Sequence, residues 1–205
     1  MDALILVDIQ NDFLPGGSLA VPRGEEIIAV ANSVQERFPL VVVTQDWHPA
    51  GHGSFASAHP GKNAFEKTIL GGVDQVLWPD HCVQGTRGAE FSRDLDMKHV
   101  EAILRKGTDP GIDSYSAFFD NARRKATGLK GYLKSRGVKR VFFAGLAADY
   151  CVYYSIMDAL SLGFGAVLIE DGTRPISEEG FVTAQKEILS QGGSIVLSES
   201  LSDIG

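Results

Sequence analysis

Residues 141–169 read VFFAGLAADYCVYYSIMDALSLGFGAVLI, and this stretch indicates how the chain folds. The apolar run at 141–144 is typical of a strand that is buried on both faces. Apolar residues then recur at helical spacing as far as Gly163, and a second apolar run follows at 166–169. The stretch therefore predicts a strand, a helix and a second strand parallel to the first.

The same alternation continues on both sides of this unit. Further strands are predicted at 3–7, 40–44, 100–104 and 194–197, and further helices at 27–38, 129–133 and 181–189. Because strands that alternate with helices form a sheet covered on both faces, we predict an α/β fold. The expected architecture is a Rossmann-like, three-layer α/β/α sandwich with a mostly parallel sheet of about six strands. A length of 205 residues fits a single domain over residues 1–205.

Two long stretches interrupt the alternation, one from Asp46 to about Asp94 and one from Gly107 to about Ala122. Both are rich in glycine, proline, histidine, aspartate and serine. Long irregular segments are uncommon within a compact domain and are often functional, although a solvated insertion has the same composition.

The composition limits the classes of partner. The formal net charge of −7 argues against nucleic acid or an anionic membrane, since both bind basic surfaces. No run approaches the ~20 apolar residues of a transmembrane helix. Two cysteines do not make a disulfide framework, and no basic segment precedes the first apolar run, so we expect a cytoplasmic protein. The usual motifs of dinucleotide sites, phosphate loops and serine hydrolases do not occur.

Reactive side chains follow the first four predicted strands. Asp8, Asp46 and Lys106 each come within two residues of a predicted strand end, and GLAADYC at 145–151 follows the fourth strand. Ligands of open α/β sheets bind beyond the carboxyl ends of the strands. We therefore expect these groups to share one site.

Cys151 is the candidate nucleophile of this site. It falls in the first turn of a predicted helix, where the positive helix end favours a thiolate and free N–H groups can bind an oxyanion. Asp8 is a candidate general base, and Lys106 is a candidate charge partner for either group. Each has an ordinary alternative: a buried core thiol, a capping or salt-bridged carboxylate, and a solvated lysine. Their convergence on one edge of the sheet favours the catalytic interpretation.

The first irregular stretch contains a second candidate cluster. Asp46, His48, His52 and His81 supply the carboxylate and imidazole groups that suit zinc, iron or manganese. Asp46 and His48 alternate on an extended segment and therefore share a face. A histidine-rich surface loop is the alternative that the spacing leaves open. Cys82 is a competing nucleophile or metal ligand, although no predicted helix begins there.

Five motifs occur in order along the chain. They are DIQNDFLPGGSL at 8–19, TQDWHP at 44–49, WPDHCV at 78–83, KG at 106–107 and GLAADYC at 145–151. Together they resemble the nicotinamidase (pyrazinamidase) branch of the isochorismatase-like cysteine hydrolases. The paired D-x-H and W-P-x-H-C motifs distinguish this branch from relatives that lack the metal.

The resemblance implies three sets of site residues. The expected catalytic triad is Asp8, Lys106 and Cys151. The expected ligands of one divalent metal ion, zinc in preference to iron or manganese, are Asp46, His48 and His81. The expected substrate pocket is lined by Phe13, Trp78, Tyr115, Ala147 and Tyr150. His52 lies where some members have a further ligand, and the family's cis peptide falls at Leu146–Ala147.

The resemblance also implies the reaction. Cys151 would attack nicotinamide to form a thioester while the metal holds the pyridine ring, and water would then release nicotinate for NAD salvage. Pyrazinamide is a further expected substrate. Three alternatives stay open: a carbamoyl or ureido amidohydrolase of the same superfamily, a hydrolase using metal-bound hydroxide with a structural Cys151, and a non-enzymatic small-molecule binder. The oligomeric state is left undecided.

Overall fold

The computed structural model describes residues 1–203 and contains a six-stranded sheet in the order β5–β2–β1–β6–β7–β8. Its strands are β1 (Asp2–Val7), β2 (Val41–Asp46), β5 (Val100–Lys106), β6 (Arg140–Leu146), β7 (Gly165–Arg174) and β8 (Ser194–Val196). Every neighbouring pair in this sheet is parallel. The prediction of a parallel sheet is therefore confirmed.

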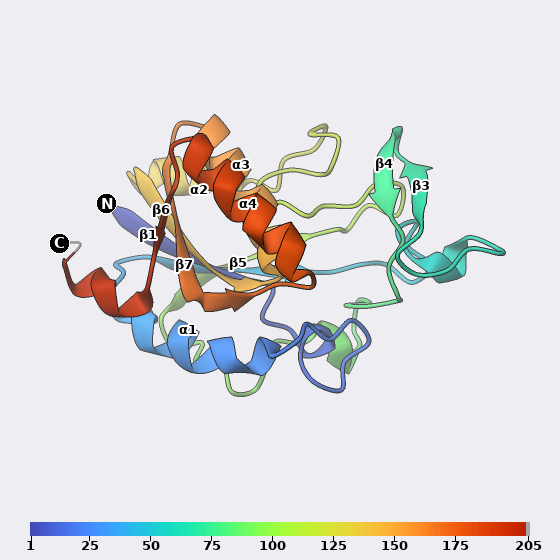
Figure 1. Ribbon diagram of the computed structural model, residues 1–205, viewed down its shortest axis with the longest axis horizontal. Coiled ribbons are helices and arrows are strands. Elements are labelled where there is room, and N and C mark those ends of the chain that lie inside the picture. The colour runs from blue at the N-terminus through green and yellow to red at the C-terminus, as the bar shows by residue number, and fades with distance from the viewer. Residues whose placement is uncertain (204–205) are drawn as a thin grey trace.

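Helices cover both faces of the sheet (Figure 1). On one face lies α1 (Ile27–Gln35), and on the other lie α2 (Leu129–Ser135), α3 (Tyr153–Ser161) and α4 (Glu178–Ser190). Leu4 and Leu6 of β1 pack on the α1 side, whereas its Ala3, Ile5 and Val7 pack on the opposite side. Since both faces are buried, consecutive strand residues are apolar, and the three-layer α/β/α sandwich is confirmed. No helix among residues 1–203 has the length and apolar character needed to cross a membrane.

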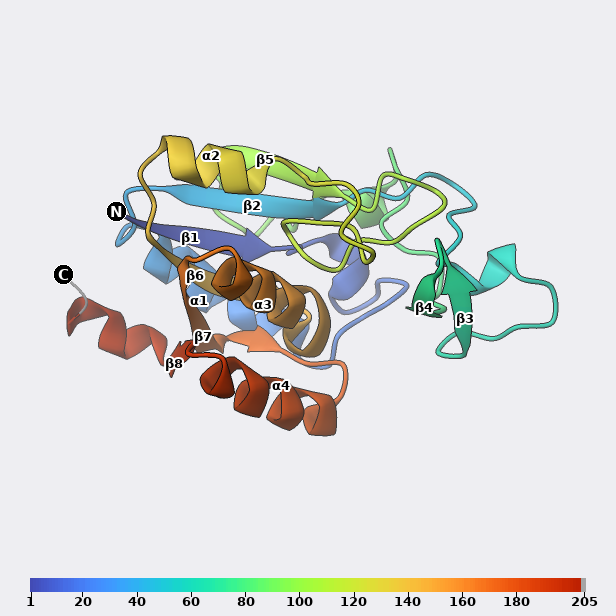
Figure 2. The same cartoon turned by 90° about the horizontal axis from the view of Figure 1, so that it is seen from above.

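The first irregular stretch contains a regular element that was not predicted. In it, β3 (Lys67–Leu70) and β4 (Val73–Val76) form an antiparallel hairpin that stands apart from the main sheet (Figure 2). Gly71 and Gly72 connect the strands with φ values of 59° and 81°, which glycine adopts without steric cost. A Gly-Gly pair between two short runs is the sequence signal for such a turn.

The carboxyl ends of β1, β2, β5 and β6 lie at one edge of the sheet, because these four strands are neighbours and parallel. The loops of both irregular stretches gather beyond that edge, as Figure 2 shows for the ends of β1, β2 and β5. The fold therefore brings together the residues that follow these four strands.

Candidate active site

Lys106, the last residue of β5, lies at the centre of the site. Its Nζ is 2.8 Å from Asp8 Oδ2, 2.7 Å from Asp46 Oδ1 and 3.4 Å from Cys151 Sγ. It also donates to the carbonyl oxygen of Ser114 at 3.0 Å. Both Lys106 and Asp8 are buried, so solvent screens their charges little. The structure thus brings together all three residues of the expected triad.

The carboxylates around Lys106 keep it charged. Burial lowers the pKa of the ammonium, but the charges of Asp46 and Asp8 outweigh burial and hold that pKa well above its usual value. Burial raises the pKa of Asp8, and the negative charge of Asp46 adds to this rise. The attraction of Lys106 lowers the pKa, but it offsets the rise only in part. Oδ1 of Asp8 accepts a hydrogen bond from Thr44 Oγ1 at 2.7 Å. Asp8 is thus a buried carboxylate with a raised proton affinity, as a general base requires.

Cys151 lies in the turn between β6 and α3. Ala148–Val152 form a π-helical turn, in which Val152 N–H donates to Ala147 O at 3.1 Å, and such turns are frequent at functional sites. Burial raises the pKa of the Cys151 thiol well above its usual value; nearby carboxylates add to the effect, and Lys106 opposes it. The expected thiolate is therefore not the form of Cys151 in the resting site, where burial and the nearby carboxylates outweigh Lys106. Cys151 keeps its proton until a base removes it.

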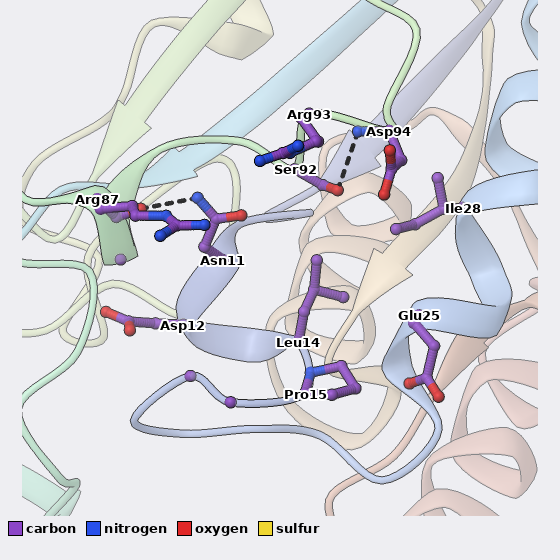
Figure 3. Close-up of a pocket in the computed structure, with 13 residues that line it drawn as sticks. Asn11, Asp12, Leu14, Pro15, Glu25, Ile28, Arg87, Ser92, Arg93 and Asp94 are labelled. Carbon is purple, nitrogen blue, oxygen red and sulfur yellow. Dashed lines mark hydrogen bonds between the residues drawn. The ribbon is translucent and has the colours of Figure 1, made fainter.

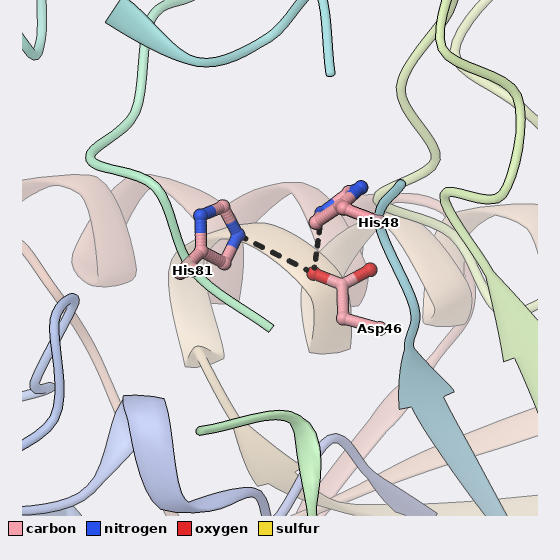
Figure 4. A group of neighbouring side chains, drawn as sticks. All are labelled: Asp46, His48 and His81. Atoms are coloured by element: carbon pink, nitrogen blue, oxygen red, sulfur yellow. Dashed lines mark ion pairs between the residues drawn. The ribbon is translucent and has the colours of Figure 1, made fainter. Parts of the chain in front are cut away.

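A second cluster begins at the other oxygen of Asp46 (Figure 4). Asp46 Oδ2 lies 3.3 Å from His48 Nε2 and 3.6 Å from His81 Nε2, and all three side chains are buried. The Nδ1 atoms of the two histidines face the carbonyl oxygens of Gly107 and Pro79, at 2.9 and 2.8 Å. Since a carbonyl oxygen only accepts hydrogen bonds, each Nδ1 carries a proton, and the Nε2 atom of each ring is the one that faces the cluster.

Three acceptors that face one another fit a cation. A metal with bonds of about 2.0–2.1 Å holds its ligands roughly 3–3.4 Å apart, close to the separations in this cluster. His48 Nε2 is buried and has no hydrogen-bond partner among residues 1–203, as expected of a metal ligand. Asp46, His48 and His81 are therefore brought together as predicted, and they suit a divalent metal ion.

The geometry places His52 as a support for His48. Its Nδ1 accepts a hydrogen bond from Ser54 N–H at 3.1 Å, and its Nε2 faces the carbonyl oxygen of Asp109 at 2.7 Å. Its ring packs beside that of His48, with centroids 4.4 Å apart. His48, His52 and Asp113 also have ligand-like spacing, but His52 would have to give up one of these bonds to coordinate a metal.

A small pocket opens beside Cys151. Its lining includes all five residues of the expected substrate pocket: Phe13, Trp78, Tyr115, Ala147 and Tyr150. The rings of Trp78 and Tyr150 meet edge to face with centroids 4.9 Å apart. The Leu146–Ala147 peptide bond is cis, as the resemblance implies. Aromatic walls next to a thiol suit a flat ring that carries an acyl group.

A buried polar network behind this wall was not predicted. Gln75, on β4, donates to Tyr115 Oη at 2.8 Å and to Asp113 Oδ2 at 3.1 Å. Trp78 Nε1 donates to the same hydroxyl at 3.2 Å, and Asp113 itself lines the cavity. The hairpin thus supports the pocket wall from behind. Neither Gln75 nor Asp113 belongs to a motif, and only the irregular stretches that contain them pointed to the site.

Two further features lie away from this chemistry. Cys82 is fully buried, and it does not line the pocket beside Cys151, so a substrate in that pocket does not reach its thiol. A wider depression of about 1070 Å³ borders the Asn11–Phe13 turn and extends to Glu25 and Asp94 (Figure 3). Its lining, which lies within the described part of the chain, includes no thiol and no imidazole.

The chain is similar to known proteins over most of its length. Residues 2–200 match the isochorismatase domain family. The chain is 47% identical over 179 residues to the nicotinamidase of Escherichia coli K12, covering 85% of this chain and 84% of that protein. It is 44% identical over 200 residues to the nicotinamidase of Acinetobacter baylyi, covering 97% and 94% of the two chains.

Solved structures share the fold. A nicotinamidase and pyrazinamidase of Acinetobacter baumanii has a TM-score of 0.95 at 45% identity, covering 98% of this chain and 97% of that one. The yeast nicotinamidase bound to the inhibitor nicotinaldehyde has a TM-score of 0.91 at 33% identity, covering 96% and 100%. A pyrazinamidase of Pyrococcus horikoshii in complex with zinc has a TM-score of 0.79 at 38% identity, covering 96% and 98%.

Proposed function

The chain belongs to the isochorismatase family, and we propose that it hydrolyses nicotinamide to nicotinate and ammonia, with pyrazinamide as a further substrate. The observation that best supports this function is the position of Lys106. Its Nζ lies 2.8 Å from Asp8 and 3.4 Å from Cys151, next to a pocket with aromatic walls. The similarity to nicotinamidases over most of the chain supports the choice of substrate. Nicotinate formed in this way supplies NAD salvage. Since a reducing compartment preserves a catalytic thiol, we also propose a cytoplasmic location.

In this mechanism Cys151 is the nucleophile and Asp8 is the general base. An oxygen of Asp8 lies within 4.8 Å of the Cys151 sulfur, and the raised pKa of Asp8 lets it take the thiol proton as the sulfur attacks the amide carbon. Lys106 stabilises the thiolate by its charge. Asp8 returns the proton to the leaving ammonia, which leaves a thioester on Cys151. Asp8 then takes a proton from the water that attacks the thioester. As the C–S bond breaks, Asp8 returns this proton to the Cys151 sulfur, and the product acid ionises to nicotinate.

Backbone and aromatic groups bind the substrate. We assign the N–H groups of Ala147 and Cys151 to the developing oxyanion, because both residues line the cavity at the π-helical turn. Phe13 and Trp78 flank the ring, while Tyr115 and Tyr150 close the pocket.

Zinc is the metal that we assign to Asp46, His48 and His81, because a pyrazinamidase of similar fold was solved with zinc. When bound, the ion supplies a Lewis acid for the ring nitrogen of the substrate. His52 holds the His48 ring in place through their packing. The same donor set also accepts iron or manganese, which elemental analysis of the purified protein distinguishes.

Hydrolysis of nicotinamide by the purified, metal-loaded enzyme tests this function, with ammonia and nicotinate both measured. A carbamoyl amino acid serves as the matched substrate of the alternative amidohydrolases. We expect kcat/KM for nicotinamide to exceed that for the carbamoyl compound by at least about 100-fold. The reverse order would assign the chain to the carbamoyl hydrolases.

A further inference from the structure

Gln10 and Asp12 follow the general base Asp8 in the turn that leaves β1, and the proposed reaction gives neither of them a role. We propose that both are positioning residues, whose side chains hold the two segments that carry the metal ligands Asp46 and His81. This inference rests on the proposed metal site, and it concerns how that site is built before any metal binds.

Gln10 is fully buried and uses both ends of its amide on the backbone of Asp46. Its Oε1 accepts a hydrogen bond from Asp46 N–H at 2.8 Å, and its Nε2 donates to Asp46 O at 2.8 Å. The other Nε2 hydrogen goes to Ala89 O at 2.9 Å. β1 pairs with β2 only as far as Val43. At Asp46 the Gln10 amide therefore supplies the hydrogen-bond donor and acceptor that the backbone of a longer β1 would supply.

The backbone around Gln10 is fixed in turn. Gln10 N–H donates to Asp8 O at 2.8 Å, and Asp8 itself has a left-handed φ of 49°. Ile9 O accepts from Ser92 N–H at 3.0 Å, and Asn11 N–H donates to Glu90 O at 3.0 Å. One tight turn therefore sets the positions of both the general base and the amide that holds Asp46.

Asp12 reaches the segment that carries His81. Its Oδ2 accepts a hydrogen bond from Cys82 N–H at 2.7 Å, and its Oδ1 accepts one from Ser18 N–H at 3.3 Å. Cys82 has a left-handed φ of 46°, which is uncommon for a residue with a side chain. Since His81 directly precedes Cys82, this bond fixes the direction in which the imidazole faces the other ligands. Gly88 lies so close that a Cβ atom there would overlap the Asp12 carboxylate.

These contacts give the metal ligands their positions in the metal-free protein. Without them, the end of β2 at Asp46 and the loop that carries His81 would be held by fewer contacts. Metal binding would then cost more conformational entropy and would be weaker. Groups that orient metal ligands commonly change metal affinity about 10–100-fold when they are removed. Metal affinity is therefore the property that identifies their role.

Gln10→Met tests the first contact, and Gln45→Met is its matched control. Gln45 is also buried, lies next to Asp46 and donates to the same Ala89 O at 2.9 Å, but it bonds neither Asp46 nor another proposed ligand. The dissociation constant for Zn²⁺ is measured by competition with a chromophoric chelator, beside thermal unfolding of the metal-free proteins. We expect Gln10→Met to raise this constant about 10–100-fold and Gln45→Met to raise it less than about threefold. Equal increases in the two variants would overturn the inference, even if both unfold at the same temperature.

Asp12→Ala and Asp12→Asn test the hydrogen bond from Cys82 N–H to Asp12. Because the Asp12 side chain is only half-buried, these variants also test the inference if Gln10→Met does not fold. Asparagine keeps an oxygen that can accept from Cys82 N–H, so Asp12→Asn should bind Zn²⁺ nearly as tightly as the unaltered protein. Asp12→Ala should bind at least about tenfold more weakly. Identical affinities of the two variants would contradict the role of this bond. These measurements of zinc affinity need no nicotinamide. If the variants show the expected order of zinc affinities but the unaltered protein does not hydrolyse nicotinamide, the positioning role of Gln10 and Asp12 stands and the proposed substrate is wrong.

Discussion

Lys106 Nζ donates to Oδ1 of Asp46 over 2.7 Å, while Oδ2 of the same carboxylate faces the imidazoles of His48 and His81. Asp46 therefore joins the acid–base site to the proposed metal site, with one oxygen in each. Burial raises the pKa of Asp46, but Lys106 and His48 outweigh burial and hold it well below its usual value. The carboxylate stays ionised, and the two sites share its negative charge.

Replacement of Lys106 by methionine leaves Asp8 and Asp46 buried without their shared cation. We expect kcat to fall at least about 100-fold, because Asp8 gains a proton and the thiolate loses its charge partner. The free energy of unfolding at pH 7 should fall by about 3–5 kcal/mol in urea denaturation. Lys130→Met, at an exposed lysine of α2, is the control. An unchanged kcat in the Lys106 variant would contradict this role.

Metal binding should weaken at low pH, because His48 coordinates only when its Nε2 is free of a proton. In the metal-free protein burial lowers the pKa of His48, but the charge of Asp46 outweighs burial and raises it to about 8. Below that pH a proton competes with the metal, so the zinc dissociation constant should rise about tenfold per pH unit from pH 8 to 6 and stay level above pH 8. Chelator-buffered titrations at these pH values measure it, and a constant independent of pH would contradict the assignment of His48.

The same proton affects the stability of the metal-free fold. Because the pKa of His48 is raised from 6.5 to about 8 on folding, protonation stabilises the folded state fully below pH 6.5. This contribution is lost as the pH rises through 8. Urea denaturation of the metal-free protein should therefore show lower stability at pH 9 than at pH 6 from this group, and His48→Gln should reduce that difference.

Removal of the proposed ligands should remove the metal. The Asp46→Ala, His48→Ala double variant should bind no zinc at micromolar concentration, because one imidazole alone remains. His52→Ala should still bind zinc stoichiometrically, since both ring nitrogens of His52 are occupied by other bonds. Elemental analysis after gel filtration measures both. Full occupancy in the double variant would place the metal elsewhere.

An aromatic ring at position 13 should contribute to substrate binding. We expect Phe13→Leu to raise KM for nicotinamide about 3–10-fold, because stacking is lost while an apolar side chain is kept. The change in kcat should be smaller than the change in KM, since the Phe13 ring has no group that takes or gives a proton in the reaction. Phe65→Leu is the control, because Phe65 packs on Trp78 but is 59% exposed and does not line the pocket. Equal KM values for the two variants would remove Phe13 from the ring site.

Sequence reasoning located the site because parallel strands end at one edge of a sheet. The apolar runs that become β1, β2 and β5 stop at or just before Asp8, Asp46 and Lys106. Parallel strands end at the same edge whatever their order in the sheet, so the site could be located without knowing that order. His81 was different, because a loop returns it to Asp46 through contacts between distant segments. Its place came only from the resemblance to a known family. In the structure Cys82 N–H donates to Asp12 Oδ2, and His48 N–H donates to Cys82 O, so both bonds hold the segment that carries His81.

The resting state of Cys151 was not predictable in the same way. Its position after a strand indicated a helix N-terminus and hence a thiolate. The pKa depends instead on burial and on the carboxylates that surround Lys106, and these distances exist only in the folded chain. The hairpin was missed because each of its strands has only four residues, too few for a clear alternation of polar and apolar positions.

Attack by Cys151 on the amide carbon is the step on which the proposed reaction depends, and ammonia release from nicotinamide by Cys151→Ala tests it. Cys82→Ala is the matched control, because it removes the other thiol of the chain. Thioester catalysis predicts that Cys151→Ala lowers kcat at least about 1000-fold with zinc still bound, while Cys82→Ala keeps most of its activity. Ammonia release that survives in Cys151→Ala would contradict thioester catalysis and make this thiol a structural residue.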